Sequence, residues 1–143
     1  MDFTSCLEKQ QKIKELFTSC QTSEERYFKL IELGKALPPL DPRYKTEENL
    51  VSGCQSQVFL HTYIKDGLIY FEAASEALIS AGLVALLIQI YSGQPPEALF
   101  KCPPTFLNEL GIYASLSPAR SNGLAQIYLR MQKEALSFLS SMT

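Results

Sequence analysis

Two runs with alternating side chains, residues 57–65 and 68–74, constrain the fold most strongly because they meet at Asp66-Gly67. An Asp-Gly pair accepts the positive φ angles of a type I′ turn, so it predicts a two-residue β-hairpin. One face of this hairpin is apolar almost throughout, and we expect that face to pack against helices. The predicted register pairs Lys65 with Leu68, Ile64 with Ile69, Thr62 with Phe71 and Leu60 with Ala73.

The opposite face of the hairpin places Tyr63 across from Tyr70. The single histidine, His61, lies across from Glu72 on the same face. Amphipathic aromatic rings and a pair of opposite charges both tolerate water. We therefore interpret His61 as a cross-strand partner of Glu72 rather than as a catalytic group.

Most of the remaining chain has helical periodicity. Residues 76–91 are apolar on nearly every side, which predicts a buried central helix, and Ser75 is expected to cap it. The other expected helices cover 5–19, 22–37 with a Thr22/Glu25 capping box, 96–100, 104–110 before Gly111, and a long last helix that Ser117 and Pro118 open. Helices around a small antiparallel sheet predict an α+β domain.

The length of 143 residues suits one domain over 1–143. A formal net charge of −2 lacks the basic excess that nucleic-acid binding needs, so no nucleic acid is expected. The longest apolar run, residues 83–88, is too short to cross a membrane. The first residues carry no export signal, and we expect a cytoplasmic protein with free thiols.

The four cysteines, Cys6, Cys20, Cys54 and Cys102, lie 14, 34 and 48 positions apart. This spacing contains no close Cys-x-x-Cys pair, which zinc sites and dithiol redox sites use. One histidine is too few for a typical catalytic zinc site. We therefore expect neither a metal site nor an iron–sulfur cluster held by this chain.

The segment 49–58 is the best candidate for chemistry, because Gly53 permits a tight turn that places Cys54 at a loop tip. The neutral hydrogen-bonding residues Gln55, Ser56 and Gln57 follow. A thiol of pKa ~8.5 is only slightly ionised at neutral pH, yet that fraction suffices for attack on a disulfide-like sulfur. A cysteine hydrolase would also need a positioned imidazole, which His61 does not offer.

Several motifs together closely resemble the SufE family of sulfur-acceptor proteins. The shared motifs are Gly-Cys-Gln-Ser-Gln-Val at 53–58, Arg26-Tyr27, residues 30–38 and 49–51, Ser75, Gly82-Leu83, and Leu-Ser-Pro-Ala-Arg-Ser-Asn-Gly-Leu at 116–124. They occur in the same order along nearly the whole chain.

The resemblance implies a SufE/IscU-like fold with about three antiparallel strands backed by helices. It implies that Cys54 accepts sulfur from the persulfide of a SufS-type cysteine desulfurase, stimulating that enzyme, and passes the sulfur to a SufBCD-like iron–sulfur scaffold. Such a chain is an accessory carrier rather than a stand-alone enzyme. The pyridoxal phosphate belongs to the desulfurase, so no cofactor is expected here.

The chain departs from the family at Phe59, where many relatives have Trp, and at Ala81, where they often have a Lys that could help docking. Gln55 and Gln57 either polarise the persulfide or satisfy loop backbone groups.

Arg120 lies just inside a helix start, where a positive charge opposes the helix dipole. We interpret it as a residue that braces the Cys54 loop or faces the partner.

A persulfide is easily lost to small thiols and oxidants, so we expect Cys54 to tuck against Val51 and Val58 in the free protein and to swing outward on docking. Two interpretations remain open for the thiol. One is the sulfur carrier, and the other is a redox or regulatory thiol module that binds a desulfurase without carrying sulfur. The sequence also leaves open whether the chain forms a homodimer.

Overall fold

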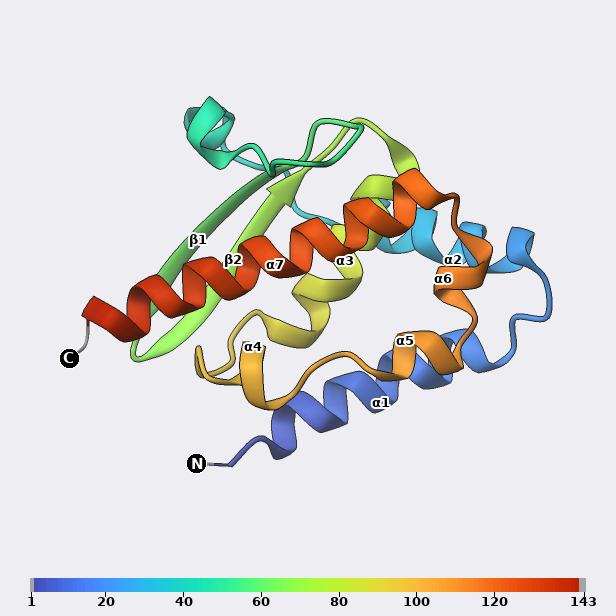
Figure 1. Cartoon of the computed structure of the whole chain (residues 1–143), viewed down its shortest axis with the longest axis horizontal. Helices are drawn as coiled ribbons and strands as arrows, with labels where there is room; N and C mark the ends of the chain where they lie inside the picture. The colour runs from blue at the N-terminus through green and yellow to red at the C-terminus, as the bar shows by residue number, and fades with distance from the viewer. Residues whose placement is uncertain (1, 142–143) are drawn as a thin grey trace.

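The computed structural model describes residues 2–141 and arranges helices around one antiparallel β-hairpin (Figure 1). The elements follow in the order α1 (Thr4–Thr18), α2 (Ser23–Lys35), the 3-10 turns η1 (Pro42–Tyr44) and η2 (Glu47–Asn49), β1 (Phe59–Lys65), β2 (Leu68–Ala74), α3 (Leu78–Tyr91), α4 (Ala98–Lys101), α5 (Phe106–Glu109), α6 (Ile112–Ser115) and α7 (Pro118–Ser141). The α+β fold class predicted from the sequence is confirmed.

The hairpin has the predicted register at every position, from Lys65 opposite Leu68 outward. Both turn residues have positive φ, 53° at Asp66 and 78° at Gly67, as a type I′ turn requires. On the expected apolar face, four side chains are buried against the helices. These are Leu60, Ile69, Phe71 and Ala73.

The outer face of the hairpin carries a row of stacked rings. His61 stacks on Tyr44 of η1 with ring centroids 3.6 Å apart, and Tyr63 stacks on Tyr70 at 5.2 Å. The His61 Nε2 atom lies 3.9 Å from Glu72 Oε1 across the strands. His61 therefore pairs with Glu72 as predicted, and Tyr44 covers its ring.

The expectation of about three strands is wrong for the described residues, which contain a two-stranded sheet. The segment before the Cys54 loop makes only an isolated bridge, between Leu50 and Phe59. The turn η2 ends at Asn49 and the Cys54 loop begins directly after Val51, so the extended run is too short to form a strand. β1 starts at Phe59 rather than at residue 57, because the carbonyls of Gln57 and Val58 bind Ser75 and Val51 at the end of the Cys54 loop.

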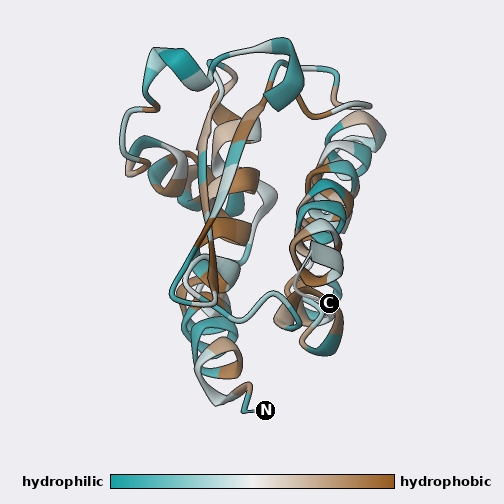
Figure 2. Cartoon of the chain, turned by 90° about the vertical axis from the view of Figure 1, so that its left-hand side faces the viewer, coloured by the Kyte–Doolittle hydropathy of each residue, from teal (hydrophilic) through white to brown (hydrophobic). Residues whose placement is uncertain are grey.

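The helix α3 is the centre of the core, and ten of its fourteen residues are buried. It contacts α1, α2, α7 and β2, and its hydrophobic turns lie in the interior in Figure 2. The closest of these contacts joins α3 to α2 through two glycines. A Cβ atom at Gly82 would lie 2.1 Å from the Leu30 carbonyl oxygen, and one at Gly34 would lie 2.7 Å from the Gly82 nitrogen.

The predicted cap of α3 is wrong, because the helix begins at Leu78 and Ala77 is its N-cap residue. The Ser75 hydroxyl instead donates a 2.7 Å hydrogen bond to the Gln57 carbonyl and accepts one from the Ala77 N–H. Ser75 thus ties the start of α3 to the end of the Cys54 loop. A sequence pattern cannot show this competing acceptor, which comes from a segment eighteen residues away.

Helices α1, α2, α4, α5 and α7 lie close to their predicted positions, whereas the one-turn helix α6 after Gly111 was not predicted. At the start of α2 the Thr22 hydroxyl accepts from the Glu25 N–H, but the Glu25 carboxylate accepts from the Gln21 N–H rather than completing the capping box at Thr22. Ser117 accepts from the Arg120 N–H at the start of α7. This last helix runs along one side of the molecule and is seen from end to end in Figure 1.

We predict that Gly82→Ala lowers the free energy of unfolding by about 3 kcal/mol, because the new methyl group would overlap the Leu30 carbonyl and force α2 and α3 apart. Gly123→Ala is the matched control. It is also a buried helical glycine, but its Cβ would meet nothing closer than the Cys54 sulfur at 3.9 Å. Urea unfolding should show a stability equal to or above that of the wild type for Gly123→Ala, since alanine is the better helix former. Equal losses in both variants would contradict the close-packing explanation.

Candidate functional site

Cys54 lies at the tip of a loop whose two ends are joined. The Val51 N–H donates a 2.9 Å hydrogen bond to the Val58 carbonyl and closes the loop at its base. Gly53 has a φ of +84°, a left-handed conformation that favours glycine. The turn that the sequence predicts at Gly53 is thus present, and it directs the next side chain toward α7.

The Cys54 thiol points at the first turns of α7. Its Sγ atom donates a weak hydrogen bond to the Gly123 carbonyl, with 3.7 Å between sulfur and oxygen. A Cβ atom at position 123 would lie 3.9 Å from the sulfur, so the thiol rests directly against the surface of the helix. The thiol is half-buried, whereas Cys6, Cys20 and Cys102 are all buried.

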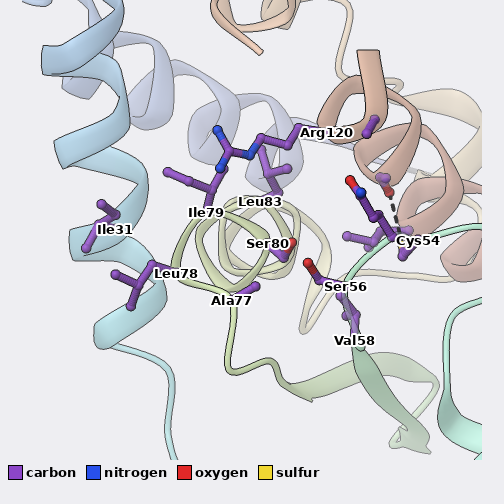
Figure 3. A pocket seen from close by; sticks show the side chains of 14 residues that line it. Ile31, Cys54, Ser56, Val58, Ala77, Leu78, Ile79, Ser80, Leu83 and Arg120 are labelled. Atoms are coloured by element: carbon purple, nitrogen blue, oxygen red, sulfur yellow. Dashed lines mark hydrogen bonds between the residues drawn. The ribbon is translucent and has the colours of Figure 1, made fainter. Parts of the chain in front are cut away.

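The thiol faces a cavity of about 430 Å³, which we call the Cys54 cavity, between the loop, α3 and α7 (Figure 3). Its apolar lining comes from Ile31, Val58, Ala77, Leu78, Ile79, Leu83, Ala119 and Ile127. Its polar lining comes from Gln55, Ser56, Ser80 and Arg120. The cavity could hold a small polarisable group such as a terminal sulfur atom, with hydroxyl and amide groups near it.

Burial raises the pKa of the Cys54 thiol, because desolvation penalises the charged thiolate. The protein therefore holds the thiol in its neutral form at physiological pH. This state is a poor nucleophile and a poor target for oxidants, since both reactions need the thiolate. Burial therefore disfavours both reactions in this conformation.

The structure brings three of the predicted supporting residues to the Cys54 cavity, namely Gln55, Ser56 and Arg120. Gly53 shapes the turn beside it. Gln57 does not line it, but it lines a second cavity of about 470 Å³ with Lys45 and Phe59, and a third of about 410 Å³ with Cys54 and Gln55. Of the two glutamines, only Gln55 lines the Cys54 cavity itself, whereas both line the third cavity beside the thiol.

Arg120 reaches the Cys54 cavity from α7, and its side chain is exposed. Its guanidinium carbon lies 5.7 Å from the centre of the Tyr27 ring, a cation–π geometry. Within residues 2–141 no carboxylate lies within ion-pair distance of it. The charge is thus available at the rim of the cavity.

Two polar side chains of α7 hold the Cys54 loop, and the sequence reasoning assigned no role to either. Asn122 donates a 2.9 Å hydrogen bond from Nδ2 to the Gly53 carbonyl. Arg130 donates to the carbonyls of Leu50 at 2.9 Å and Glu48 at 2.6 Å. Asn122 belongs to the 116–124 motif and lies eight residues before Arg130 on one helix, but neither signal reveals which distant carbonyls the two side chains bind.

The second departure from the family pattern, Ala81, lies inside the fold. Ala81 is 8% exposed, and its Cβ would be 2.9 Å from a Cβ added at Gly34. In this chain the position supports the contact of α2 with α3 and presents no charge at the surface.

No group of three or more His, Cys, Asp or Glu side chains that could hold a metal ion occurs within residues 2–141. In the same part of the chain, no helix is long and apolar enough to cross a bilayer.

Comparison with known proteins identifies one family. The model of the SufE, Fe–S metabolism associated, domain matches residues 11–135. The chain is 41% identical over 129 residues to SufE-like protein 1, chloroplastic/mitochondrial, of Arabidopsis thaliana, an alignment that covers 90% of this chain and 35% of the plant protein. The chain thus spans about a third of the length of that relative.

Bacterial relatives match over most of their own length. The chain is 37% identical over 127 residues to an uncharacterised SufE-like protein of Synechocystis, covering 89% of this chain and 80% of the relative. It also superimposes on the solution structure of a hypothetical protein from Thermus thermophilus with a TM-score of 0.76 at 28% identity. That match covers 92% of this chain and 96% of the other.

The raised pKa of Cys54 leads to a prediction about pH. Alkylation of Cys54 by iodoacetamide should show its pH midpoint at a higher pH in the folded protein than in the same chain unfolded in urea, because burial delays formation of the thiolate. The measurement is the rate at each pH, followed by mass spectrometry of the Cys54 peptide. A folded-state midpoint at or below the unfolded one would show that the thiol is not desolvated.

Proposed function

Because the chain belongs to the SufE family, whose domain is associated with iron–sulfur metabolism, we propose that it carries sulfur as a persulfide on Cys54. The observation that supports this most is the placement of the four cysteines. Three are buried, and the fourth stands at a loop tip at the edge of a cavity with polar and apolar walls. Iron–sulfur cluster assembly consumes sulfur, and a single thiol at a loop tip can deliver it.

The sulfur donor in this proposal is a cysteine desulfurase of the SufS type that holds a persulfide on its own cysteine. The Cys54 thiolate attacks the outer sulfur atom of that persulfide. A bond forms between the Cys54 sulfur and the outer sulfur while the donor S–S bond breaks, and the donor cysteine leaves as a thiolate that takes up a proton. One zero-valent sulfur atom moves, and no external oxidant or reductant is consumed.

A scaffold of the SufBCD type would receive the sulfur by the same chemistry. A scaffold thiolate attacks the outer sulfur of the Cys54 persulfide, and Cys54 leaves as a thiolate. The carrier returns to its starting state and needs no cofactor, since the pyridoxal phosphate acts in the desulfurase. The protein is thus an accessory sulfurtransferase-type carrier that stimulates the desulfurase by emptying it.

The Cys54 cavity supports the idea that the site is shielded between transfers. The thiol contacts the Gly123 carbonyl of α7, Val58 lines the Cys54 cavity, and Val51 lines a neighbouring cavity together with Cys54. In this position the sulfur is neutral and partly covered. Docking of the donor would expose the loop tip, and exposure would remove the desolvation that keeps the thiol protonated.

Arg120 is proposed as a docking residue at the rim of the cavity. Its charge is exposed and free of carboxylate partners within the described chain. Leu78 lines the same cavity and is 55% exposed, so an apolar contact and a cation lie near one another. A partner surface that carries a carboxylate beside an apolar patch would match Arg120 and Leu78.

Sulfur loading is the test of this function. After incubation with a cysteine desulfurase and free cysteine, the intact mass should rise by one sulfur atom, and the added mass should map to the Cys54 peptide. Cys54→Ser should abolish the gain with little change in melting temperature, because the side chain packs only partly against the core and its one hydrogen bond is weak.

Cys20→Ala is the control for loading, because it removes a different thiol and should load like the wild type. A wild-type protein that never gains sulfur, or that gains only oxygen or an intermolecular disulfide at Cys54, would favour the regulatory thiol module instead.

The docking role of Arg120 has its own test. Arg120→Glu should slow sulfur transfer from the desulfurase by about tenfold, because a reversed rim charge chiefly affects association. Loading by a small polysulfide should stay at the wild-type rate, since that donor needs no docking surface. Equal slowing with both donors would place Arg120 in the chemistry at the sulfur rather than in docking.

A further inference from the structure

The tip of the Cys54 loop is tied to α7 by neighbouring residues of that helix. Asn122 holds the Gly53 carbonyl through its side-chain amide at 2.9 Å, and the carbonyl of Gly123 accepts the hydrogen bond of the Cys54 thiol. The two bonds join adjacent residues of the helix, 122 and 123, to adjacent residues of the loop, 53 and 54, with the helix donating in the first and the loop donating in the second. The first is an ordinary hydrogen bond, whereas a thiol is a weak donor.

The base of the loop is held independently and more firmly. Val51 and Val58 are paired through the backbone, and the guanidinium of Arg130 donates to the carbonyls of Leu50 and Glu48. The Nε atom of the same guanidinium donates a 2.9 Å hydrogen bond to the Glu134 carboxylate. These contacts can persist while the tip moves, because none of them involves residues 52–57.

We infer that Asn122 is a positioning residue for Cys54, whose amide keeps the thiol in the closed, desolvated position and lengthens the life of a persulfide formed there. This inference rests on the proposed function for its biological meaning. The Asn122 side chain is exposed, so water can replace the hydrogen bond once a partner displaces the tip. The residue therefore sets how often the thiol is accessible without being needed for the fold.

Asn122→Ala is the direct test. Loss of one hydrogen bond should raise the alkylation rate of Cys54 by about fivefold, the factor that corresponds to a net worth of about 1 kcal/mol. The pH midpoint of alkylation should also fall toward that of the unfolded chain, because an opened loop is better solvated. Asn122→Asp should act in the same direction, since it replaces the donor with an anion beside the Gly53 carbonyl.

Gln132→Ala is the matched control, because Gln132 is also an amide of α7 that donates to a backbone carbonyl, that of Leu99 at 3.0 Å. It is remote from the Cys54 loop in sequence and contacts, and it should leave both readouts unchanged. The buried Cys6, Cys20 and Cys102 report on global unfolding in the same samples. Faster labelling of all four cysteines in Asn122→Ala, or an unchanged rate at Cys54, would overturn the inference.

A second readout separates this inference from the proposed function. When wild type and Asn122→Ala are loaded with sulfur by a desulfurase and then exposed to glutathione, the variant should lose its persulfide several-fold faster. Equal lifetimes would overturn the inference while leaving the carrier function intact. If the wild type does not load, the carrier function fails, and the alkylation experiment still decides whether Asn122 positions the thiol.

Discussion

The carbonyl of Leu30 occupies the space that a side chain at position 82 would need, and the rest of the fold is built on this contact between α2 and α3. Because Gly82 lets the two helices approach so closely, α3 can be surrounded by α1, α2, α7 and the hairpin at once. Its apolar side chains then become the floor of the Cys54 cavity through Ile79 and Leu83. A change that separates α2 from α3 would therefore also alter the wall that the thiol faces.

The features that depend on local sequence could be predicted, and the hairpin shows why. An Asp-Gly turn and a side-chain period of two determine the register, because a slip of one residue would move every apolar side chain to the solvent face. The long last helix followed in the same way from Ser117 and Pro118. The placement of Cys54 at a loop tip needed only the turn at Gly53, which has the expected positive φ.

The features that depend on contacts between distant segments could not be predicted from local patterns. Ser75 looks like a helix cap, yet its hydroxyl is taken by the Gln57 carbonyl. Asn122 and Arg130 look like ordinary polar residues of an amphipathic helix until the backbone carbonyls of Gly53 and Leu50 are placed beside them. In each case the deciding partner is a backbone carbonyl, which every residue has and which therefore leaves no mark in the sequence.

A sulfur carrier must satisfy two opposed requirements, and the energies at this loop are of a size that allows both. Under the proposed carrier function, the closed position would protect the sulfur through desolvation and through one ordinary hydrogen bond from Asn122, a bond with a net worth of about 1 kcal/mol. A partner that binds even at micromolar affinity gains about 8 kcal/mol, so a small part of its binding energy is enough to release the tip. Arg130 fixes the base of the loop, so the thiol would stay close to α7 even when the tip is released. Firmer attachment of the tip would protect the sulfur longer, but it would also take more of the binding energy that transfer requires.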